Sequence, residues 1–243
     1  MSANLQNSFI KGARDGIPIA LGYLSVSVAV GISAVSMGIP VWGAVLISLL
    51  NVTSAGEVAG MPLIVAGAPL IEMALTQLVI NLRYALMSLT LTQKLDPSLG
   101  TPGRMAVSFG ITDEIFAMAS SRPEKVGGRY MAGLIAVPVA GWTLGTFIGA
   151  AASSLLPPSL RSALGIAIYG MFIAIVLPPA VKDRAVRVVA LMAAVLSSLF
   201  AFAPVFDKLS SGFAVILAAV AASALGAFLF PLKDEDDSRK EAD

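Results

Sequence analysis

The stretch YMAGLIAVPVAGWTLGTFIGAAASSL, residues 130–155, contains no charged side chain in 26 residues. About 20 predominantly apolar residues are enough for an α-helix to cross a bilayer. Its continuous apolar character also distinguishes the stretch from a membrane β-strand, in which apolar and polar residues alternate over about 10 positions. The stretch therefore predicts a transmembrane helix and indicates an all-α integral membrane protein.

The composition of the whole chain agrees with this class. Of its 243 residues, 57% are hydrophobic and 13% are charged, whereas soluble domains carry about 25% charged residues. The chain has no Cys and no His, which excludes disulfides, thiolate metal sites and histidine-dependent catalysis. A net charge of +1 does not favour nucleic-acid binding. We expect no enzyme activity, no cofactor, no bound metal and no nucleic-acid partner.

Hydropathy predicts a polytopic bundle of eight transmembrane helices, or seven if the weak span Met105–Ser120 is re-entrant. Residues 17–231 form the predicted transmembrane domain, which residues 1–16 precede and the acidic tail 232–243 follows. We expect the first span to be retained rather than cleaved, because it is long for a signal peptide and contains Pro18. The spans are Ile17–Ser36, Trp42–Ala66, Pro69–Thr92, Met105–Ser120, Tyr130–Leu155, Ser162–Val181, Val186–Ala203 and Gly212–Phe230.

The distribution of Lys and Arg predicts the orientation, because short basic loops face the cytoplasm. In the eight-span arrangement, eleven basic residues fall on the side of the two termini and four on the opposite side. Both termini are therefore predicted to be cytoplasmic. The eleven are Lys11, Arg14, Arg122, Lys125, Arg129, Lys182, Arg184, Arg187, Lys233, Arg239 and Lys240, and the four are Lys94, Arg104, Arg161 and Lys208.

A row of small residues, Gly141, Gly145 and Gly149, repeats every four positions in the fifth span. Such rows allow helix backbones to approach closely in a membrane. We expect this face to pack against another helix.

Five ionisable residues stand inside predicted spans, where a charge is costly and commonly functional. They are Glu57, Glu72, Arg83, Asp113 and Glu114.

The stretch NVTSAGEVAG, residues 51–60, interrupts the second span with small, polar and β-branched residues. Because such residues weaken a helix, we expect a broken helix that leaves free backbone N–H groups at the start of its second half. Transporters place such ends at substrate sites near mid-membrane. Asn51, Ser54, Gly56 and Glu57 are therefore candidate substrate-binding residues, and Glu57 is also a candidate proton or ion site. The alternative is a locally kinked structural helix.

The third span is polar on two faces, with Glu72 and Arg83 on one face and Asn81 on the other. We expect such a helix to stand in the middle of the bundle. Glu72 and Arg83 are about 16 Å apart along the axis and cannot pair, so the anion for Arg83 must be Glu57, Asp113 or Glu114. Asn81 and Arg83 are candidate substrate-binding residues; the alternative for Arg83 is a structural ion pair.

Thr112, Asp113 and Glu114 follow Gly110 in the weak fourth span. Thr112 is a candidate substrate-binding residue, and Asp113 and Glu114 are candidates for proton or ion coupling. The alternative is a re-entrant or interfacial hairpin that holds the two acids at the water boundary, with Asp113 capping the following half-helix.

These motifs resemble the AzlC family of amino-acid exporters. The resemblance rests on Ser48-Leu-Leu, Ser54-Ala-Gly-Glu57, Ile80-Asn-Leu-Arg-Tyr84 and Ile111-Thr-Asp-Glu-Ile-Phe-Ala117 in this order and spacing. It continues through Arg129, Gly133, Trp142, Gly149 and the loop near Pro178, and covers about residues 8–230. Glu57 departs from the pattern, since the family usually carries Gln there, and it adds a carboxylate that can hold a proton.

The resemblance implies a secondary transporter of the bacterial inner membrane that exports branched-chain or similar aliphatic amino acids. It also implies a small hydrophobic partner of the AzlD type, with about four spans, and a homo-oligomer is a further possibility. The residues agree in outline, because a zwitterion needs helix N-termini or Arg83 for its carboxylate and an acid or carbonyls for its ammonium. No nucleotide-binding motif is present, so we expect coupling to an ion gradient, with protons favoured.

A channel or pore subunit for a small solute or cation is the alternative function, because rings of acids or carbonyls can select ions. An intramembrane enzyme is disfavoured, because no His base and no Lys within a span is available to activate a serine.

Overall fold

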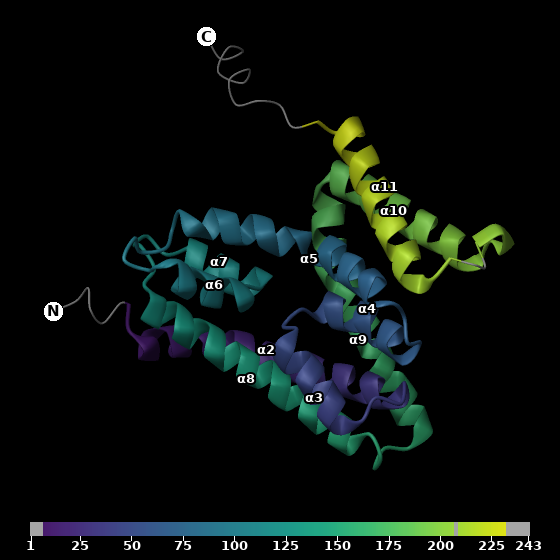
Figure 1. Ribbon diagram of the computed structural model, residues 1–243, viewed down its shortest axis with the longest axis horizontal. Coiled ribbons are helices and arrows are strands. Elements are labelled where there is room, and N and C mark those ends of the chain that lie inside the picture. The colour runs from purple at the N-terminus through teal and green to yellow at the C-terminus, as the bar shows by residue number, and fades with distance from the viewer. Residues whose placement is uncertain (1–6, 207–208, 232–243) are drawn as a thin grey trace, which may run out of the picture. The chain divides into compact units, whose positions relative to one another are not determined.

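The computed structural model describes residues 7–206 and 209–231, and the secondary structure of this part is helical (Figure 1). The predicted all-α membrane fold is confirmed. Contacts divide the chain into two compact units, of which the first contains Met1–Pro69 and Ile80–Gly170 and the second Leu70–Val79 and Met171–Asp243. The acidic tail 232–243 and the first six residues of the predicted N-terminal segment lie outside the described residues.

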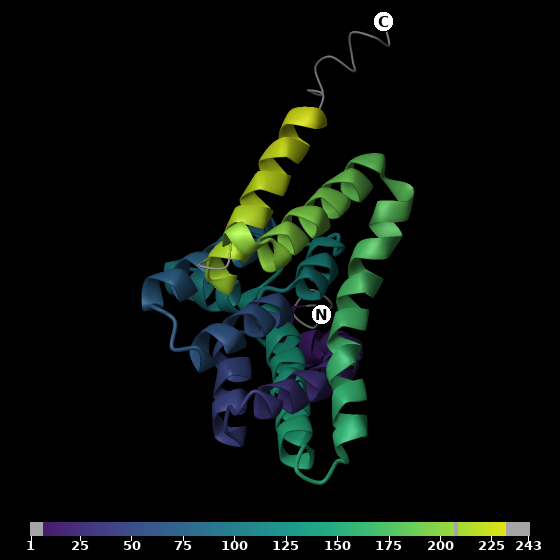
Figure 2. The same ribbon diagram turned by 90° about the vertical axis from the view of Figure 1, so that its right-hand side faces the viewer.

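Two long helices, α2 (Phe9–Ser36) and α8 (Gly128–Ala152), pack side by side in the first unit (Figures 1 and 2). They run parallel, because Gly12 faces the Tyr130 carbonyl and Gly31 faces the Thr146 carbonyl. A Cβ atom added at Gly145 would lie 2.0 Å from Ser27 Oγ. The backbones therefore touch directly, and the glycine row of α8 faces another helix as the sequence predicts.

The second predicted span is broken, as expected. It consists of α3 (Val41–Leu50) and α4 (Ser54–Val65). Asn51 and Thr53, with φ angles of −130° and −129°, leave the helical conformation between them. The Thr53 hydroxyl accepts a hydrogen bond from Gly56 N at 3.0 Å and caps α4.

The fourth predicted span is also broken, into α6 (Thr101–Phe109) and α7 (Asp113–Ser120). The chain segments before and after these helices lie beside each other: Asp96 N donates to the Val126 carbonyl at 2.9 Å, and Lys125 Nζ donates to the Gln93 carbonyl at 2.6 Å. Both ends of residues 97–125, here called the α6–α7 hairpin, thus lie next to the N-terminus of α8. The hairpin enters and returns at one end of α8, which is the chain path expected of a re-entrant or interfacial hairpin.

A single continuous helix, α5 (Leu70–Thr92), forms the third predicted span. Its C-terminal end packs with the α6–α7 hairpin and α8 around a buried apolar cluster. This core of the first unit contains Leu91, Leu95, Val107, Ile111, Ile115, Ala119, Val126, Tyr130, Met131 and Leu134. Further toward its middle α5 is not covered on both faces as expected, because Leu82 and Leu86 are exposed.

The second unit contains the start of α5, the later part of α9 (Pro158–Lys182), α10 (Arg184–Phe202), a short 3-10 turn (Pro204–Phe206) and α11 (Ser211–Leu229). Glu72 of α5 is buried against the N-terminus of α11. Its carboxylate accepts hydrogen bonds from Ser210 Oγ and from Gly212 N at 3.1 Å. The acid for which the sequence offered no partner is therefore bound by a helix N-terminus.

Within the described residues, five helices are long and apolar enough to cross a membrane: α2, α5, α8, α10 and α11. The helices α3 and α4 and the segment Phe172–Lys182 are apolar but shorter. Six of the eight predicted spans thus coincide with a continuous helix, and the other two are each divided into two short helices.

Candidate functional site

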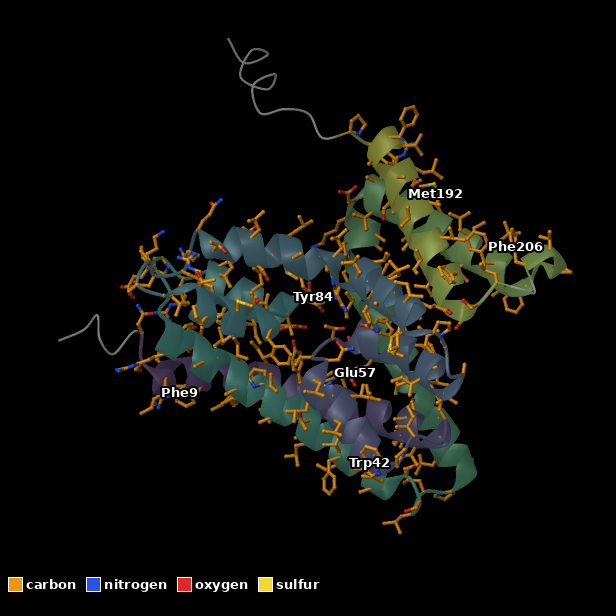
Figure 3. All side chains as sticks on the ribbon, viewed as in Figure 1. Phe9, Trp42, Glu57, Tyr84, Met192 and Phe206 are labelled. Atoms are coloured by element: carbon orange, nitrogen blue, oxygen red, sulfur yellow. The ribbon has the colours of Figure 1, made fainter. Side chains whose placement is uncertain are left out.

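Two groups of polar side chains lie in the first unit, each beside one of the broken helices. The Arg83 cluster contains Arg83, Tyr84, Thr112, Asp113 and Glu114, and the Glu57 cluster contains Ser48, Glu57, Trp142 and Thr146. In Figure 3 the labelled side chains of Glu57 and Tyr84 lie near the middle of the view, among other oxygen and nitrogen atoms, and Phe9 and Trp42 lie further out.

The Arg83 cluster is built on an ion pair between α5 and the first turn of α7. Arg83 Nη2 lies 3.0 Å from Asp113 Oδ2 and donates to the Tyr84 hydroxyl at 3.0 Å. The Arg83 and Asp113 side chains are 47% and 49% exposed. Of the three acids that the sequence offers to Arg83, Asp113 is the one that it meets. Because half of each side chain is uncovered, this chain leaves the pair accessible to a ligand.

The N-terminus of α7 is held by a hydroxyl network. Thr112 caps the helix by accepting from Ile115 N at 3.4 Å. The Tyr23 hydroxyl of α2 lies 2.6 Å from Thr112 Oγ1 and 2.5 Å from Glu114 Oε2. A phenol has one hydrogen to donate, so Tyr23 donates to the Glu114 carboxylate and accepts from Thr112. Glu114 is thereby fixed beside the cap.

The Glu57 cluster is buried. Glu57 is 1% exposed, and Ser48 and Thr146 are fully buried. Glu57 Oε1 accepts from Trp142 Nε1 at 2.6 Å, and Oε2 accepts from Ser48 Oγ at 2.7 Å. Ser48 Oγ lies 2.8 Å from Thr146 Oγ1, and either hydroxyl can donate. Both carboxylate oxygens are thus bound by uncharged donors from α3 and α8.

Tyr23 and Trp142 bring the two clusters into contact. Their rings meet edge to face, with centroids 5.5 Å apart and an interplanar angle of 77°. The Tyr23 hydroxyl reaches the first turn of α7, and the Trp142 indole reaches Glu57 in the first turn of α4. The N-termini of the two half-helices are therefore connected through one aromatic pair.

The other predicted substrate-binding residues lie at the break between α3 and α4 or on α5. Asn51 ends α3, and its Oδ1 accepts from Thr53 Oγ1 at 3.3 Å. Gly56 is buried and donates its N–H to the cap of α4. Ser54 begins α4 and Asn81 lies two residues before Arg83; both are partly buried.

Four residues of these networks were not singled out by their chemistry: Tyr23, Ser48, Trp142 and Thr146. Ser48 and Trp142 are noted in the sequence only as part of the family pattern. Hydroxyls in apolar spans, such as those of Ser48 and Thr146, commonly bond the helix backbone and predict no site. A Tyr and a Trp in apolar segments do give a signal, since each carries a polar hydrogen that needs a partner when buried.

In the described part of the chain, no three Asp or Glu side chains are grouped so that they could hold a metal ion. The arrangement offers instead an accessible guanidinium, the backbone N–H groups at the start of α7, and two carboxylates beside them. These groups match a small ligand that carries both an anionic and a cationic group.

Comparison with known proteins agrees with the motifs. The chain is 27% identical over 202 residues to the inner membrane protein YgaZ of Escherichia coli, covering 80% of this chain and 82% of that protein. It is 32% identical over 181 residues to an uncharacterized membrane protein of Archaeoglobus fulgidus, covering 74% and 78%. No solved structure matches the chain. Residues 18–156, which include both broken helices, match the model of the AzlC protein family, and the chain therefore belongs to the AzlC family of membrane proteins.

Proposed function

We propose that the chain is the large subunit of a secondary transporter that exports branched-chain or similar aliphatic amino acids across the cytoplasmic membrane, coupled to protons. The observation that carries this proposal is the accessible Arg83–Asp113 pair at the N-terminus of α7. An intramembrane arginine needs an anion at all times, and Asp113 is that anion when no substrate is bound.

The substrate carboxylate competes with Asp113 for Arg83. A guanidinium binds a carboxylate through two parallel hydrogen bonds, and the start of α7 adds backbone N–H groups and the positive end of the helix dipole. The substrate ammonium binds Glu114, beside the displaced Asp113. We propose that Asn51, Ser54, Gly56 and Asn81 also contact the substrate.

The same exchange couples transport to protons. Once Arg83 binds the substrate carboxylate, Asp113 loses its cationic partner, and a carboxyl without a partner in an apolar surrounding takes up a proton more readily. Release of the substrate restores the ion pair and expels the proton on the same side, so substrate and proton cross together and the outward gradient of the substrate drives export. In this scheme proton movement and substrate movement each require the other.

The proposal includes a small hydrophobic membrane subunit. Leu82, Leu86 and Leu89 lie on one face of α5 and are more than half exposed. The same helix carries Arg83. We propose that apolar helices of the partner cover it; a second copy of this chain and lipid are the other candidates.

The test is counterflow of labelled leucine in proteoliposomes, with and without a proton gradient. Arg83→Lys keeps the charge and loses the planar fork, so we expect at least about a tenfold slower exchange in a protein that still inserts. Arg187→Lys on the exposed part of α10 is the matched control.

Two results contradict the proposal. If Arg83→Gln exchanges leucine at the normal rate and with normal pH dependence, Arg83 has only a structural role. If flux rises linearly with leucine concentration and shows no counterflow, the protein is a channel.

A further inference from the structure

Beside the accessible Arg83 cluster, the first unit contains a second carboxylate that no substrate group reaches. Glu57 is buried, and its two oxygens are occupied by Trp142 Nε1 and Ser48 Oγ. In the described residues no ion pair involves Glu57. Binding of a substrate ammonium there would require both hydrogen bonds to break. This geometry suits an occupant smaller than any amino acid.

We infer that the Glu57 cluster is a dedicated proton site: the Glu57 carboxyl takes up and releases one proton, and Ser48 and Thr146 reverse their hydrogen bond as it does so. This inference deepens the proposed function, on which it rests for the role of the proton, and it assigns Glu57 to the proton alone rather than to the substrate.

The hydrogen bonds of the cluster accommodate both forms of the carboxyl. When Glu57 is ionised, Ser48 donates to Oε2 and accepts from Thr146. When a proton is on Oε2, Glu57 donates to Ser48, whose own hydrogen turns to Thr146 Oγ1. The 2.8 Å distance between the two hydroxyls serves either direction. Thr146 can then donate to a backbone carbonyl of its own helix, as helical threonines do. No heavy atom has to move.

Trp142 selects a proton over a metal cation at this site. Its indole nitrogen is a donor only, and its hydrogen points at Oε1 in both forms of Glu57. A sodium ion on this oxygen would face that hydrogen and would leave the indole without its acceptor. A proton on Oε2 leaves the bond from Trp142 intact.

The ionisable groups that face Glu57 are Tyr23 of the aromatic pair and the groups beyond it. The helix α3 has none, α4 has only Glu57 itself, and α8 has none after Tyr130. The groups that face the cluster through Tyr23 and α7 are Tyr23, Glu114, Asp113, Arg83 and Tyr84. The contact between Tyr23 and Trp142 is the direct side-chain route by which the substrate can influence Glu57.

The experiment uses Trp142 as the reporter. The chain has two tryptophans, and Trp42 is 69% exposed on α3, so Trp42→Phe leaves Trp142 as the only indole. We expect its fluorescence, in full-length protein in lipid nanodiscs, to change sigmoidally across about pH 5 to 9. Glu57→Gln keeps an acceptor for Trp142 but cannot titrate, and the curve should become flat. Glu72→Gln, at the other buried acid, is the matched control and should leave the curve unchanged.

Ser48→Ala is a second variant in case Glu57→Gln does not fold. Loss of a hydrogen bond to a charged group should move the midpoint by about one pH unit or more. The inference is overturned if the Trp42→Phe protein shows no transition, or if the transition persists in Glu57→Gln. It is also overturned if the signal depends on sodium when choline chloride replaces sodium chloride at constant pH.

Addition of leucine distinguishes this inference from the proposed function. A shift of the midpoint by leucine that Tyr23→Phe weakens supports both. A titration that depends on Glu57 but ignores leucine supports the proton site and counts against the amino-acid substrate.

Discussion

Tyr23 is an uncharged residue that contacts both the Arg83 cluster and the Glu57 cluster. Its hydroxyl contacts Thr112 and Glu114, and its ring contacts Trp142. Without the hydroxyl, the carboxylate of Glu114 loses a donor and the cap of α7 loses a neighbour. The ring contact with Trp142 does not depend on the hydroxyl. Removal of the hydroxyl oxygen therefore separates the hydrogen bonds of Tyr23 from its ring contact.

Tyr23→Phe should lower leucine transport without unfolding the protein. A hydrogen bond to a charged group contributes about 1.5–3 kcal/mol, which corresponds to about a tenfold or larger loss of affinity or rate. Initial rates in proteoliposomes at low leucine concentration measure the effect. Tyr169→Phe, at an exposed position on α9, is the control. Equal rates in the two variants would show that the hydroxyl does not position the α7 N-terminus for transport.

The residues that sequence analysis found are those whose charge is costly in a membrane. Arg83 and Asp113 were recognised because an apolar span gives such a charge no ordinary reason to be there. The choice of Asp113 over Glu57 and Glu114 as the partner depends on how α5 and α7 approach each other, and no residue pattern encodes that approach. The neutral members of the Glu57 cluster come from α3 and α8, which are far apart in sequence, so only the fold brings them together.

At the scale of elements, local signals located the helix breaks but not the path of the chain through them. The caps Thr53 and Thr112 and the residues around them predict interruption. Hydropathy cannot distinguish a broken span that continues across the membrane from one that turns back, because both are apolar over the same length. The contacts between residues 93–96 and 125–126 decide this for the α6–α7 hairpin.

The cap of α4 can be tested by itself. Thr53→Ala removes the acceptor for Gly56 N and should destabilise the protein by about 1 kcal/mol. Because the first turn of α4 carries Glu57, transport should fall as well. Thr53→Ser keeps the hydroxyl and should restore both. Thermal unfolding in detergent, together with leucine uptake, measures the pair. If the Ala and Ser variants are equally stable, the capping bond contributes nothing.

The parallel pair α2 and α8 contacts both clusters, since α2 supplies Tyr23 beside the Arg83 cluster and α8 supplies Trp142 and Thr146 to the Glu57 cluster. Gly145→Leu places a side chain where Ser27 Oγ and the Leu24 carbonyl already stand, at 2.0 and 2.3 Å from the first added atom. We expect loss of the folded protein, seen as aggregation in size-exclusion chromatography, rather than an altered substrate affinity. Gly22→Leu on α2, where nothing lies within 4 Å, should behave as the unmodified protein. A monodisperse, active Gly145→Leu variant would contradict this packing.

At the scale of the whole molecule, the hairpin changes the assignment of basic residues to the two sides of the membrane. The eight-span arrangement places Lys94 and Arg104 opposite the termini. In the structure, residues 93–96 lie beside 125–126 and next to the start of α8, and Arg104 binds the Leu99 carbonyl at the entry to the hairpin. Both therefore lie at the basic end with Lys125. Two of the four exceptions to the basic bias then disappear, but the hairpin alone leaves seven crossings, an odd number that would place the two termini on opposite sides.

The same geometry constrains the second predicted span. Because α2 and α8 are parallel and α5 ends beside the start of α8, we expect the continuous helix α5 to provide the return crossing. Residues 37–69 then begin and end at the opposite side from the termini. We propose that α3 and α4 also form a re-entrant pair, which enters from the side opposite to the α6–α7 hairpin.

Single cysteines test this arrangement, since the chain contains none of its own. Ser98→Cys and Lys125→Cys stand at the two ends of the α6–α7 hairpin, and Ala66→Cys follows α4; all three positions are exposed. We expect a membrane-impermeant maleimide to label the first two from the cytoplasmic side, together with a cysteine fused to the N-terminus, and to label position 66 only from the opposite side. Eight full crossings keep position 125 on the cytoplasmic side but move the other two, with position 98 on the opposite side and position 66 on the cytoplasmic side. Labelling in right-side-out and inside-out vesicles separates the two outcomes. The label reports the side of each cysteine whether or not the variant is active.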